Sequence, residues 1–112
     1  MYSHTFVDPA ELAWHPTEPG VERQVLAYDP ELMMVRVRFA AGAVGSLHQH
    51  PHRQVSYVAE GSFEVQIADE RRVLGPGGTF IVEPDVMHGV VAREAGMLID
   101  VFTPAREEFV AG

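Results

Sequence analysis

Neither cysteine nor lysine occurs among the 112 residues of this sequence. The absence of cysteine excludes disulfides, thiolate metal sites and thiol nucleophiles, and it fits a reducing compartment, so we expect a cytoplasmic protein. No apolar run approaches the ~20 residues that a membrane-spanning helix needs. The first residues, MYSHTFVDPAEL, lack the basic and apolar regions of a secretory signal peptide. We therefore expect no membrane span and no signal peptide.

Positive charge is also scarce. Eight arginines stand against sixteen acidic residues, which gives a formal net charge of −8. This balance argues against nucleic acid or an anionic membrane as a partner, because both repel an acidic surface. It gives no long-range attraction for an anionic small molecule either. An acidic substrate would have to be held locally, by an arginine or by a metal ion.

The chain shows no internal repeat or linker, and its length fits one domain, residues 1–112. Short runs rich in Val, Ile, Phe and Tyr are separated by Gly and Pro. They predict strands at residues 32–40, 55–61, 63–69, 79–83 and 97–103. Many short strands with such turns predict an antiparallel sandwich or barrel, whose interior can hold one small ligand. A single helical turn is expected where Pro104 opens AREEFV.

Half of the six histidines lie in the run HQHPHRQ, residues 48–54. On an extended strand His48 and His50 point to the same side, and Gln54 resumes that parity, whereas Pro51 interrupts the ladder and weakens the case for His52. A fourth group, His88, follows a later strand. Three imidazoles and an amide oxygen make a plausible set of ligands for a divalent metal. The alternative is a histidine-rich surface turn, or core histidines satisfied by hydrogen bonds.

Two segments resemble the paired motifs of the cupin superfamily. GAVGSLHQHPHRQVSYVAEG, residues 42–61, has the glycines and histidines of the first motif at its spacing, with Gln54 where the motif usually has Glu. GGTFIVEPDVMHGVVA, residues 77–92, fits the second, with Glu83, Asp85 and Ala92 in place of the usual Pro, Gly and Asn. The resemblance implies an all-β jelly-roll barrel, a homodimer, and one divalent metal ion (Ni, Zn, Fe or Mn) held by His48, His50, Gln54 and His88.

A narrower resemblance covers residues 21–109. The stretches HPHRQVSYVAEGSFEV, LGPGGTFIVEPDVMHGVVA and IDVFTPAREEF are similar to the KdgF-type cupins, which linearise unsaturated uronates in pectin and alginate breakdown. The last stretch is the most telling, because nothing in a general barrel demands it. Carried over by residue, the resemblance implies that Asp100, Phe102 and Arg106 line the active site beside the metal.

A neutral Gln54 has a chemical consequence. A site of three imidazoles and one amide keeps the full charge of a divalent ion for whatever enters, and so favours an anionic substrate or intermediate. It also departs from the two-histidine, one-carboxylate pattern of non-haem iron oxygenases, which favours Lewis-acid chemistry over oxygen chemistry. The alternative is that glutamine is a tolerated neutral ligand without chemical meaning.

The expected strand at 97–103 places Leu98, Asp100 and Phe102 on one face. If that face points into an apolar barrel, Asp100 is a buried acid with a raised pKa, which suits general acid/base work. The alternative is an edge-strand aspartate that faces water. In the same way, Arg106 is either a carboxylate-binding residue in the first turn of a short helix or a surface residue paired with a neighbouring glutamate.

Arg36 and Arg38 alternate with apolar residues and are expected on an outer or dimer-facing stripe. Three functions remain open. The first is opening of the ring of 4,5-unsaturated uronate monosaccharides, with Asp100 moving the proton, Arg106 holding the carboxylate and Phe102 packing on the sugar face. The second is a metal-dependent oxygenase acting on a small molecule, and the third is a non-catalytic cupin that binds a metal or a sugar.

Overall fold

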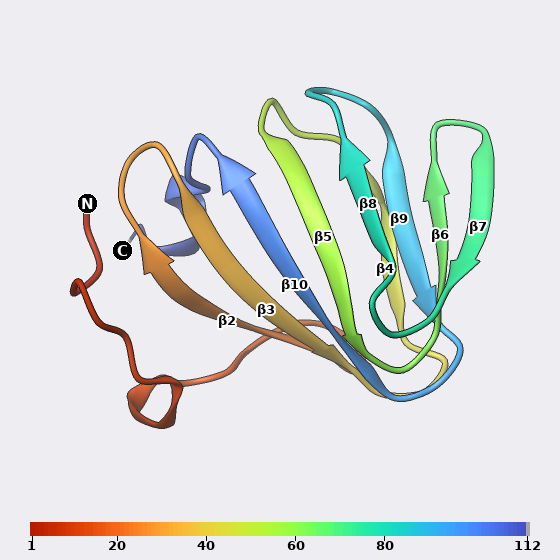
Figure 1. Ribbon diagram of the computed structural model, residues 1–112, viewed down its shortest axis with the longest axis horizontal. Helices are drawn as coiled ribbons and strands as arrows, with labels where there is room; N and C mark the ends of the chain where they lie inside the picture. Colours follow the sequence, from red (N-terminus) through yellow and green to blue (C-terminus); the bar gives the residue numbers. More distant parts are fainter. Residues whose placement is uncertain (112) are drawn as a thin grey trace.

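Ten strands form two antiparallel sheets in the computed structural model, which describes residues 1–111 (Figure 1). The larger sheet has the order β1 (His15–Glu18), β2 (Val21–Tyr28), β3 (Met33–Phe39), β10 (Gly96–Thr103), β5 (Arg53–Glu60) and β8 (Thr79–Val82). The smaller has the order β4 (Val44–His48), β9 (His88–Ala92), β6 (Phe63–Ile67) and β7 (Glu70–Leu74). Strands distant in sequence are therefore neighbours in both sheets, as in a jelly roll. Within the described residues, no helix is long and apolar enough to cross a membrane.

All five predicted strands are present, as β3, β5, β6, β8 and β10, so the all-β prediction is confirmed. The strands that the sequence did not signal are β1, β2, β4, β7 and β9. They lack a clean alternation of polar and apolar residues. Strand β7, for example, is ERRVL and lies exposed at the edge of the smaller sheet.

The C-terminal prediction is correct in place but not in detail. A 3-10 turn, η2, covers Glu107–Phe109. Arg106 is its N-cap with a non-helical backbone, so it does not lie in the first turn of a helix as expected. A second 3-10 turn, η1, covers Pro9–Glu11 near the other end of the chain, where the Asp8 carboxylate accepts a hydrogen bond from the Ala10 amide.

Strand β10 is central to the larger sheet and sets which side chains face the interior. It pairs with β3 on one side and with β5 on the other. Its buried residues alternate with half-buried ones, so Leu98, Asp100 and Phe102 share the inner face as predicted. Asp100 is only 9% exposed. The alternative of an edge-strand aspartate facing water is therefore wrong, because β10 is not an edge strand.

Two apolar clusters occupy the two ends of the barrel. The first joins both sheets, and its centre is an edge-to-face contact between Phe39 and Phe63 with ring centroids 5.1 Å apart. The second includes Met33, Phe102 and Ala105, and Phe109 of η2 packs against it. The C-terminal turn is thus fastened to the barrel by apolar contact, which fixes the position of the neighbouring Arg106.

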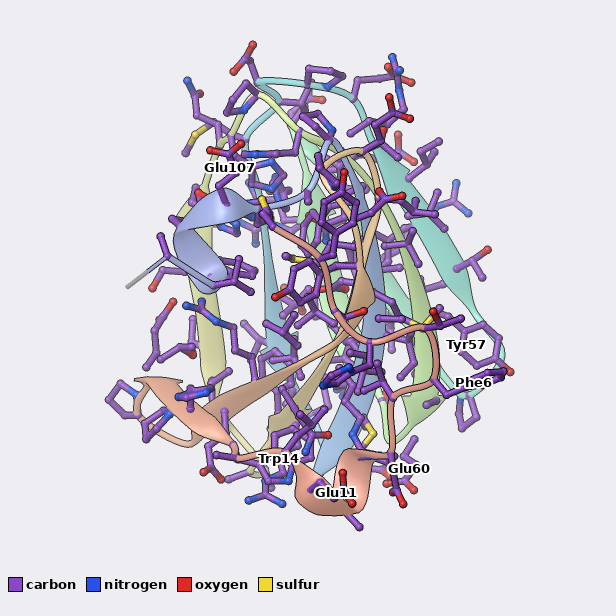
Figure 2. The ribbon with its side chains drawn as sticks, turned by 90° about the vertical axis from the view of Figure 1, so that its left-hand side faces the viewer. Phe6, Glu11, Trp14, Tyr57, Glu60 and Glu107 are labelled. Carbon is purple, nitrogen blue, oxygen red and sulfur yellow. The ribbon has the colours of Figure 1, made fainter. Side chains whose placement is uncertain are left out.

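The N-terminal segment lies along the outer side of the larger sheet (Figure 2). Gln24 is fully buried there and donates hydrogen bonds to the carbonyls of Pro9 and Leu12. The guanidinium groups of Arg36 and Arg38 lie over the Trp14 ring, at 4.9 and 4.0 Å from its centroid. The outer placement of these arginines is confirmed, and their place in a dimer contact stays a prediction.

Gly96, the first residue of β10, tests how closely this strand must approach β5. A Cβ atom at Gly96 would lie 2.5 Å from the Glu60 carbonyl oxygen, whereas one at Gly75 would meet nothing within 4 Å. We expect Gly96→Ala to lower the free energy of unfolding by about 1–3 kcal/mol, and Gly75→Ala to change it by less than about 0.5 kcal/mol. Urea denaturation measures both, and equal effects would contradict the tight packing of β10.

Candidate metal centre and pocket

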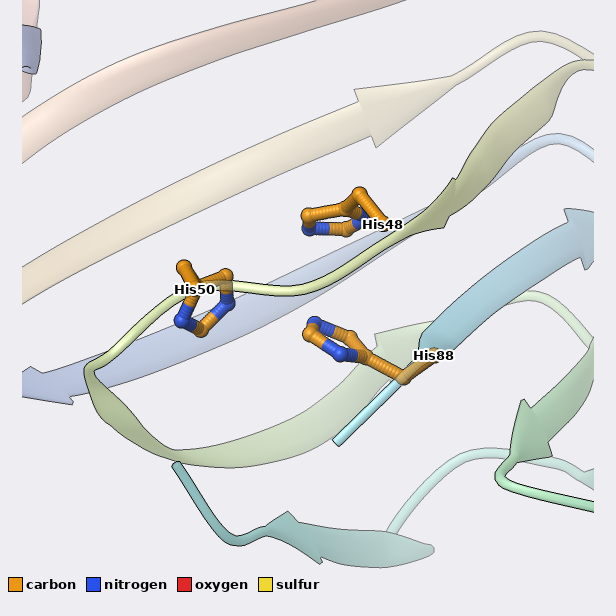
Figure 3. Close-up of side chains that lie close together, drawn as sticks. All are labelled: His48, His50 and His88. Atoms are coloured by element: carbon orange, nitrogen blue, oxygen red, sulfur yellow. The ribbon is translucent and has the colours of Figure 1, made fainter. Parts of the chain in front are cut away.

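Three histidines from two segments that are distant in sequence converge where β4 ends and β9 begins (Figure 3). His48 ends β4 and pairs in register with His88, the first residue of β9. His50 lies in the turn that carries the chain from β4 to β5, so the predicted interruption at Pro51 is confirmed. One ring nitrogen of each lies within 4.8 Å of those of the other two. The structure therefore brings together the three imidazoles that the spacing predicted.

The second motif departs from the usual residues without losing this geometry. Asp85 has a left-handed backbone, φ 64°, which aspartate tolerates better than most residues. Its amide donates a hydrogen bond to the His50 carbonyl over 2.8 Å. Glu83 forms an ion pair with Arg53 over 2.6 Å. Both replacements thus hold the turn that carries His50.

Each imidazole in the cluster has its Nδ1 atom against a backbone carbonyl oxygen. Because a carbonyl oxygen only accepts, Nδ1 must carry the hydrogen, and the Nε2 lone pair is left free to bind a metal. Within residues 1–111, Nε2 of His88 is buried and has no hydrogen-bond partner. The three Nδ1–carbonyl contacts are His48 with Ser46 at 2.8 Å, His50 with His52 at 3.1 Å, and His88 with Val86 at 2.8 Å.

Burial keeps the two inner imidazoles neutral at pH 7. Burial, together with the positive charge of Arg106 and the electrostatic effect of His88 and His48, lowers the pKa of His50 to about 4. Burial is also the main cause of the lowered pKa of His88. A neutral imidazole with a free lone pair is the form that coordinates a metal.

Gln54 places a second lone pair beside His50. Its Oε1 lies 3.1 Å from His50 Nε2, and its amide nitrogen donates to Ser56 Oγ over 2.9 Å, which fixes the orientation of the amide. A neutral His50 that donates from Nδ1 cannot also donate from Nε2, so two lone pairs face each other. A cation between them would satisfy both, and the donor set therefore fits a divalent metal ion.

His52 lies outside this cluster. The candidate ligand atoms in the described part of the chain belong to His48, His50 and His88. The His52 ring is centred 5.4 Å from that of His50, and its Nδ1 is buried without a hydrogen-bond partner. Its backbone carbonyl supports the His50 ring instead.

A cavity of about 290 Å³ opens beside the histidines. Its size suits one small molecule, since ligand pockets start at about 300 Å³. Strand β10 adds an acid and an aromatic ring to its wall, and the segment before η2 adds a cation. Its lining includes the predicted residues His48, Gln54, His88, Asp100, Phe102 and Arg106.

Asp100 is the acid in this wall. Burial raises its pKa to about 6, while a hydrogen bond from Ser56 over 2.6 Å and the charge of Arg106 oppose the rise. The side chains of Asp100, Ser56 and Gln54 form one hydrogen-bonded chain across β10 and β5. A carboxyl group that titrates near neutral pH can both take up and release a proton.

Arg106 lines the cavity and also pairs with a neighbouring glutamate. Its side chain is only 13% exposed and lines the cavity, and its Nε also lies 3.3 Å from a carboxylate oxygen of Glu108. The guanidinium carbon is 5.1 Å from the centre of the Phe102 ring and 4.5 Å from that of Phe109. A cation stacked on aromatic faces in a pocket is a suitable group for a carboxylate ligand.

The sequence did not point to Ser56, Phe109 or Arg23, which also belong to this region. Arg23 had a signal in the alternation of VERQV, because it stands between Val21 and Val25 on one face of β2. Ser56 had none, since a small polar residue in a strand carries no mark of its partner 44 positions away.

Comparison with known proteins gives a consistent picture. A family model described as Cupin domain matches residues 35–102. The pectin degradation protein KdgF of Dickeya dadantii (strain 3937) is 44% identical over 107 residues, which cover 94% of this chain and 96% of the relative.

Solved structures agree with this relationship. KdgF from Halomonas sp. superposes with a TM-score of 0.90 at 42% identity, covering 96% of this chain and 99% of its own. An RmlC-like cupin from Shewanella frigidimarina NCIMB 400 gives a TM-score of 0.93 at 42% identity, covering 96% and 97%. A predicted oxalate decarboxylase from Thermotoga maritima reaches 0.80 at 13% identity over 90% of this chain and all of its own, a likeness of fold alone.

The buried Asp100 makes the stability of the metal-free protein depend on pH. Because its pKa is about 6 in the folded protein against an ordinary value of 3.8, the folded state holds the proton more tightly than the unfolded state. Stability is therefore lost as pH rises from about 4 to about 6, by about 3 kcal/mol in total.

We expect Asp100→Asn to remove this loss, since its Oδ1 can still accept from Ser56. In urea unfolding of chelator-treated protein, the advantage of the variant should grow from about pH 4 to about pH 6 and then level off. A difference that is constant across this range would contradict a raised pKa for Asp100.

Proposed function

The chain belongs to the Cupin domain family, and from this premise we propose that it is a metal-dependent enzyme that opens the ring of 4,5-unsaturated uronate monosaccharides. The products are linear keto-uronates of pectin or alginate breakdown. One observation carries the proposal: the cavity whose wall holds His48 and His88 of the histidine cluster also holds an arginine and an acid, Asp100, whose pKa burial raises to about 6. Support also comes from the near full-length identity of 44% with a protein named for pectin degradation.

The reaction is an isomerisation that moves one proton. The substrate is a cyclic hemiacetal whose ring oxygen is bonded to C5 of the C4=C5 double bond. Loss of the proton from the C1 hydroxyl forms the aldehyde and breaks the bond between C1 and the ring oxygen, which leaves an enolate at C5. Protonation at C4 then gives the ketone. The reaction needs a proton acceptor, a proton donor and stabilisation of a negative oxygen, and it needs no redox cofactor.

Asp100 is the group that we propose to move the proton. Its carboxylate form accepts the proton of the C1 hydroxyl, and its protonated form delivers a proton to C4. A pKa of about 6 populates both forms near neutral pH. The hydrogen bond from Ser56 fixes the orientation of the carboxyl group while it changes charge.

The developing negative oxygen is stabilised at the histidine cluster. A divalent ion bound by His48, His50, Gln54 and His88 supplies positive charge there when present. Because all four donors are neutral, the residues themselves cancel none of that charge. This is our proposed reason for glutamine at position 54.

Arg106 and Phe102 would bind and orient the sugar. The guanidinium group of Arg106 can donate two parallel hydrogen bonds to a carboxylate. The substrate carboxylate can therefore take the place of Glu108 as the partner of Arg106. Phe102 offers a ring face beside Arg106, against which the sugar can pack. The net charge of −8 makes this local cation necessary for an anionic substrate.

The other two functions have less support. An oxygenase of the two-histidine, one-carboxylate type needs an acidic ligand, and the amide of Gln54 occupies the place beside His50. A protein that only binds a metal or a sugar has no need for a buried carboxyl group that titrates near pH 6.

We further propose one domain over residues 1–112, a cytoplasmic location and assembly as a homodimer. The cysteine-free sequence supports the location. Met34, Val55 and Ile81 support the dimer, because they are exposed apolar side chains in one line across β3, β5 and β8, joined by Val101 of β10. Light scattering would measure the mass, and a monomer at micromolar concentration would contradict the dimer.

The proposed metal site predicts close to one equivalent of a divalent metal in protein purified without added metal. His88→Ala should lose most of it, whereas His15→Ala, which alters an exposed histidine of β1, should keep it. Elemental analysis measures the content of each variant. Equal metal content in the two variants would contradict the site.

The charge argument for Gln54 has its own test. Gln54→Glu should keep the metal but weaken the binding of an anionic uronate at least about tenfold, because one positive charge is cancelled. Calorimetry or competition with substrate measures the affinity. If the variant binds uronates as tightly as the parent, charge does not explain the glutamine.

Asp100 carries the catalytic claim. Linearisation destroys the conjugated C4=C5–carboxylate chromophore, so the loss of ultraviolet absorbance reports the rate above the uncatalysed opening. Asp100→Asn should slow it by about 10²- to 10⁴-fold with unchanged metal content, whereas Arg106→Ala should mainly raise KM. A variant Asp100→Asn that runs at the parental rate would make Asp100 structural. A parent that accelerates no unsaturated uronate would contradict the proposed function.

A further inference from the structure

A second arginine lines the cavity from a different strand. Arg23 lies in the middle of β2, where it pairs with Val37 of β3, and both residues belong to the cavity wall. Val21, two positions earlier, belongs to the same wall. Arg23 is therefore a cation in the cavity wall, beside the apolar Val37 of β3.

Within residues 1–111 no carboxylate lies within ion-pair distance of Arg23, although four other arginines have such a partner. Its guanidinium instead lies over the Phe109 ring, 3.7 Å from the centroid. Burial lowers its pKa and the charge of Arg106 lowers it further, whereas the charge of Glu108 raises it. A half-buried cation that forms no direct ion pair is costly unless something else compensates for it.

The two cavity arginines meet at the same aromatic ring. Arg106 lies 4.5 Å from the centroid of Phe109, and Arg23 lies 3.7 Å from it. Two positive charges so close repel each other. Glu108, the ion-pair partner of Arg106, neutralises only part of their combined charge. An anion in the cavity beside this ring would meet both guanidinium groups and relieve the repulsion.

We propose that Arg23 and Arg106 together form an anion subsite of the cavity, which takes the carboxylate of a sugar acid and so sets the preference for uronates over neutral sugars. This inference rests on the proposed function for the identity of the sugar. Arg23 is then a specificity residue that touches substrate. Its attachment to Phe109 holds the guanidinium fork in place before the ligand arrives, which reduces the entropy lost on binding.

A purely structural role for Arg23 makes different predictions. If Arg23 only fastened η2 through Phe109, its loss would lower stability and weaken the binding of acidic and neutral sugars alike. If it binds a carboxylate, its loss should weaken the binding of acidic sugars selectively. The difference between two sugars that differ only in the carboxylate therefore separates the roles.

The experiment is an NMR titration of the metal-loaded full chain with galacturonate, a saturated uronate that cannot react, and with galactose, its carboxylate-free counterpart. The parent should bind galacturonate at least about tenfold more tightly. Arg23→Gln should lower the affinity for galacturonate by about 10- to 100-fold, the usual effect of losing a charged hydrogen-bond partner. It should leave the affinity for galactose unchanged. Arg38→Gln is the matched control, because Arg38 also lies over an aromatic ring but outside the cavity.

Arg23→Lys carries the test if Arg23→Gln does not fold. Lysine keeps the positive charge but lacks the two-pronged guanidinium group. The affinity for galacturonate should therefore fall by about 3- to 10-fold, again with no change in the affinity for galactose. Equal loss for both sugars, no loss for either, or a parent that does not prefer galacturonate would each overturn the inference. A parent that prefers galacturonate but opens no unsaturated uronate would leave the subsite standing and refute the proposed function.

Discussion

The site depends on one repeated interaction, a hydrogen bond from a histidine Nδ1 to a nearby backbone carbonyl. It occurs at His48, His50 and His88, in each case to a carbonyl two residues away. It fixes the tautomer, so three Nε2 lone pairs face a common space and a fourth lone pair, from Gln54, joins them. His50 and His88 do not relieve the close approach of these lone pairs by taking up a proton, because burial lowers the pKa of both. The local structure is therefore suited to hold a cation.

The pairing register of the barrel strands positions the other groups of the site. Strand β10 lies between β3 and β5, so Asp100 faces the interior opposite Ser56, and Phe102 lies opposite Gln54. The hydrogen-bonded chain from Asp100 through Ser56 to Gln54 links the proton-carrying group to the ligand set. Apolar packing of Phe109 against the barrel places its ring beside both Arg23 and Arg106. One cavity thus brings together the groups to which the proposed function assigns Lewis-acid, acid/base and carboxylate-binding roles.

The sequence predicted much of this site because its signals are local. The period of two placed His48 beside His50 and put Asp100 on one face with Leu98 and Phe102, and the motif spacing added Gln54 and His88. Whether the face of Asp100 points inward was decided only by the central position of β10. The sequence did not predict Ser56, because no short pattern records its partner across the sheet. Arg23 was also missed, although it stands on one face of β2 between Val21 and Val25. The helical position expected for Arg106 was wrong because the chain there makes only a 3-10 turn after it. Strands such as β7 were missed because exposed edges need no apolar alternation.

The tautomer of the three histidines tests the account most directly. NMR of the metal-free protein with ¹⁵N-labelled histidine, at pH 7, distinguishes a protonated from an unprotonated ring nitrogen. We expect His48, His50 and His88 to carry hydrogen on Nδ1 with Nε2 unprotonated, and added Zn²⁺ to shift the three Nε2 resonances most. Hydrogen on Nε2 in these residues, or a Zn²⁺ response confined to other histidines, would contradict a preformed metal site.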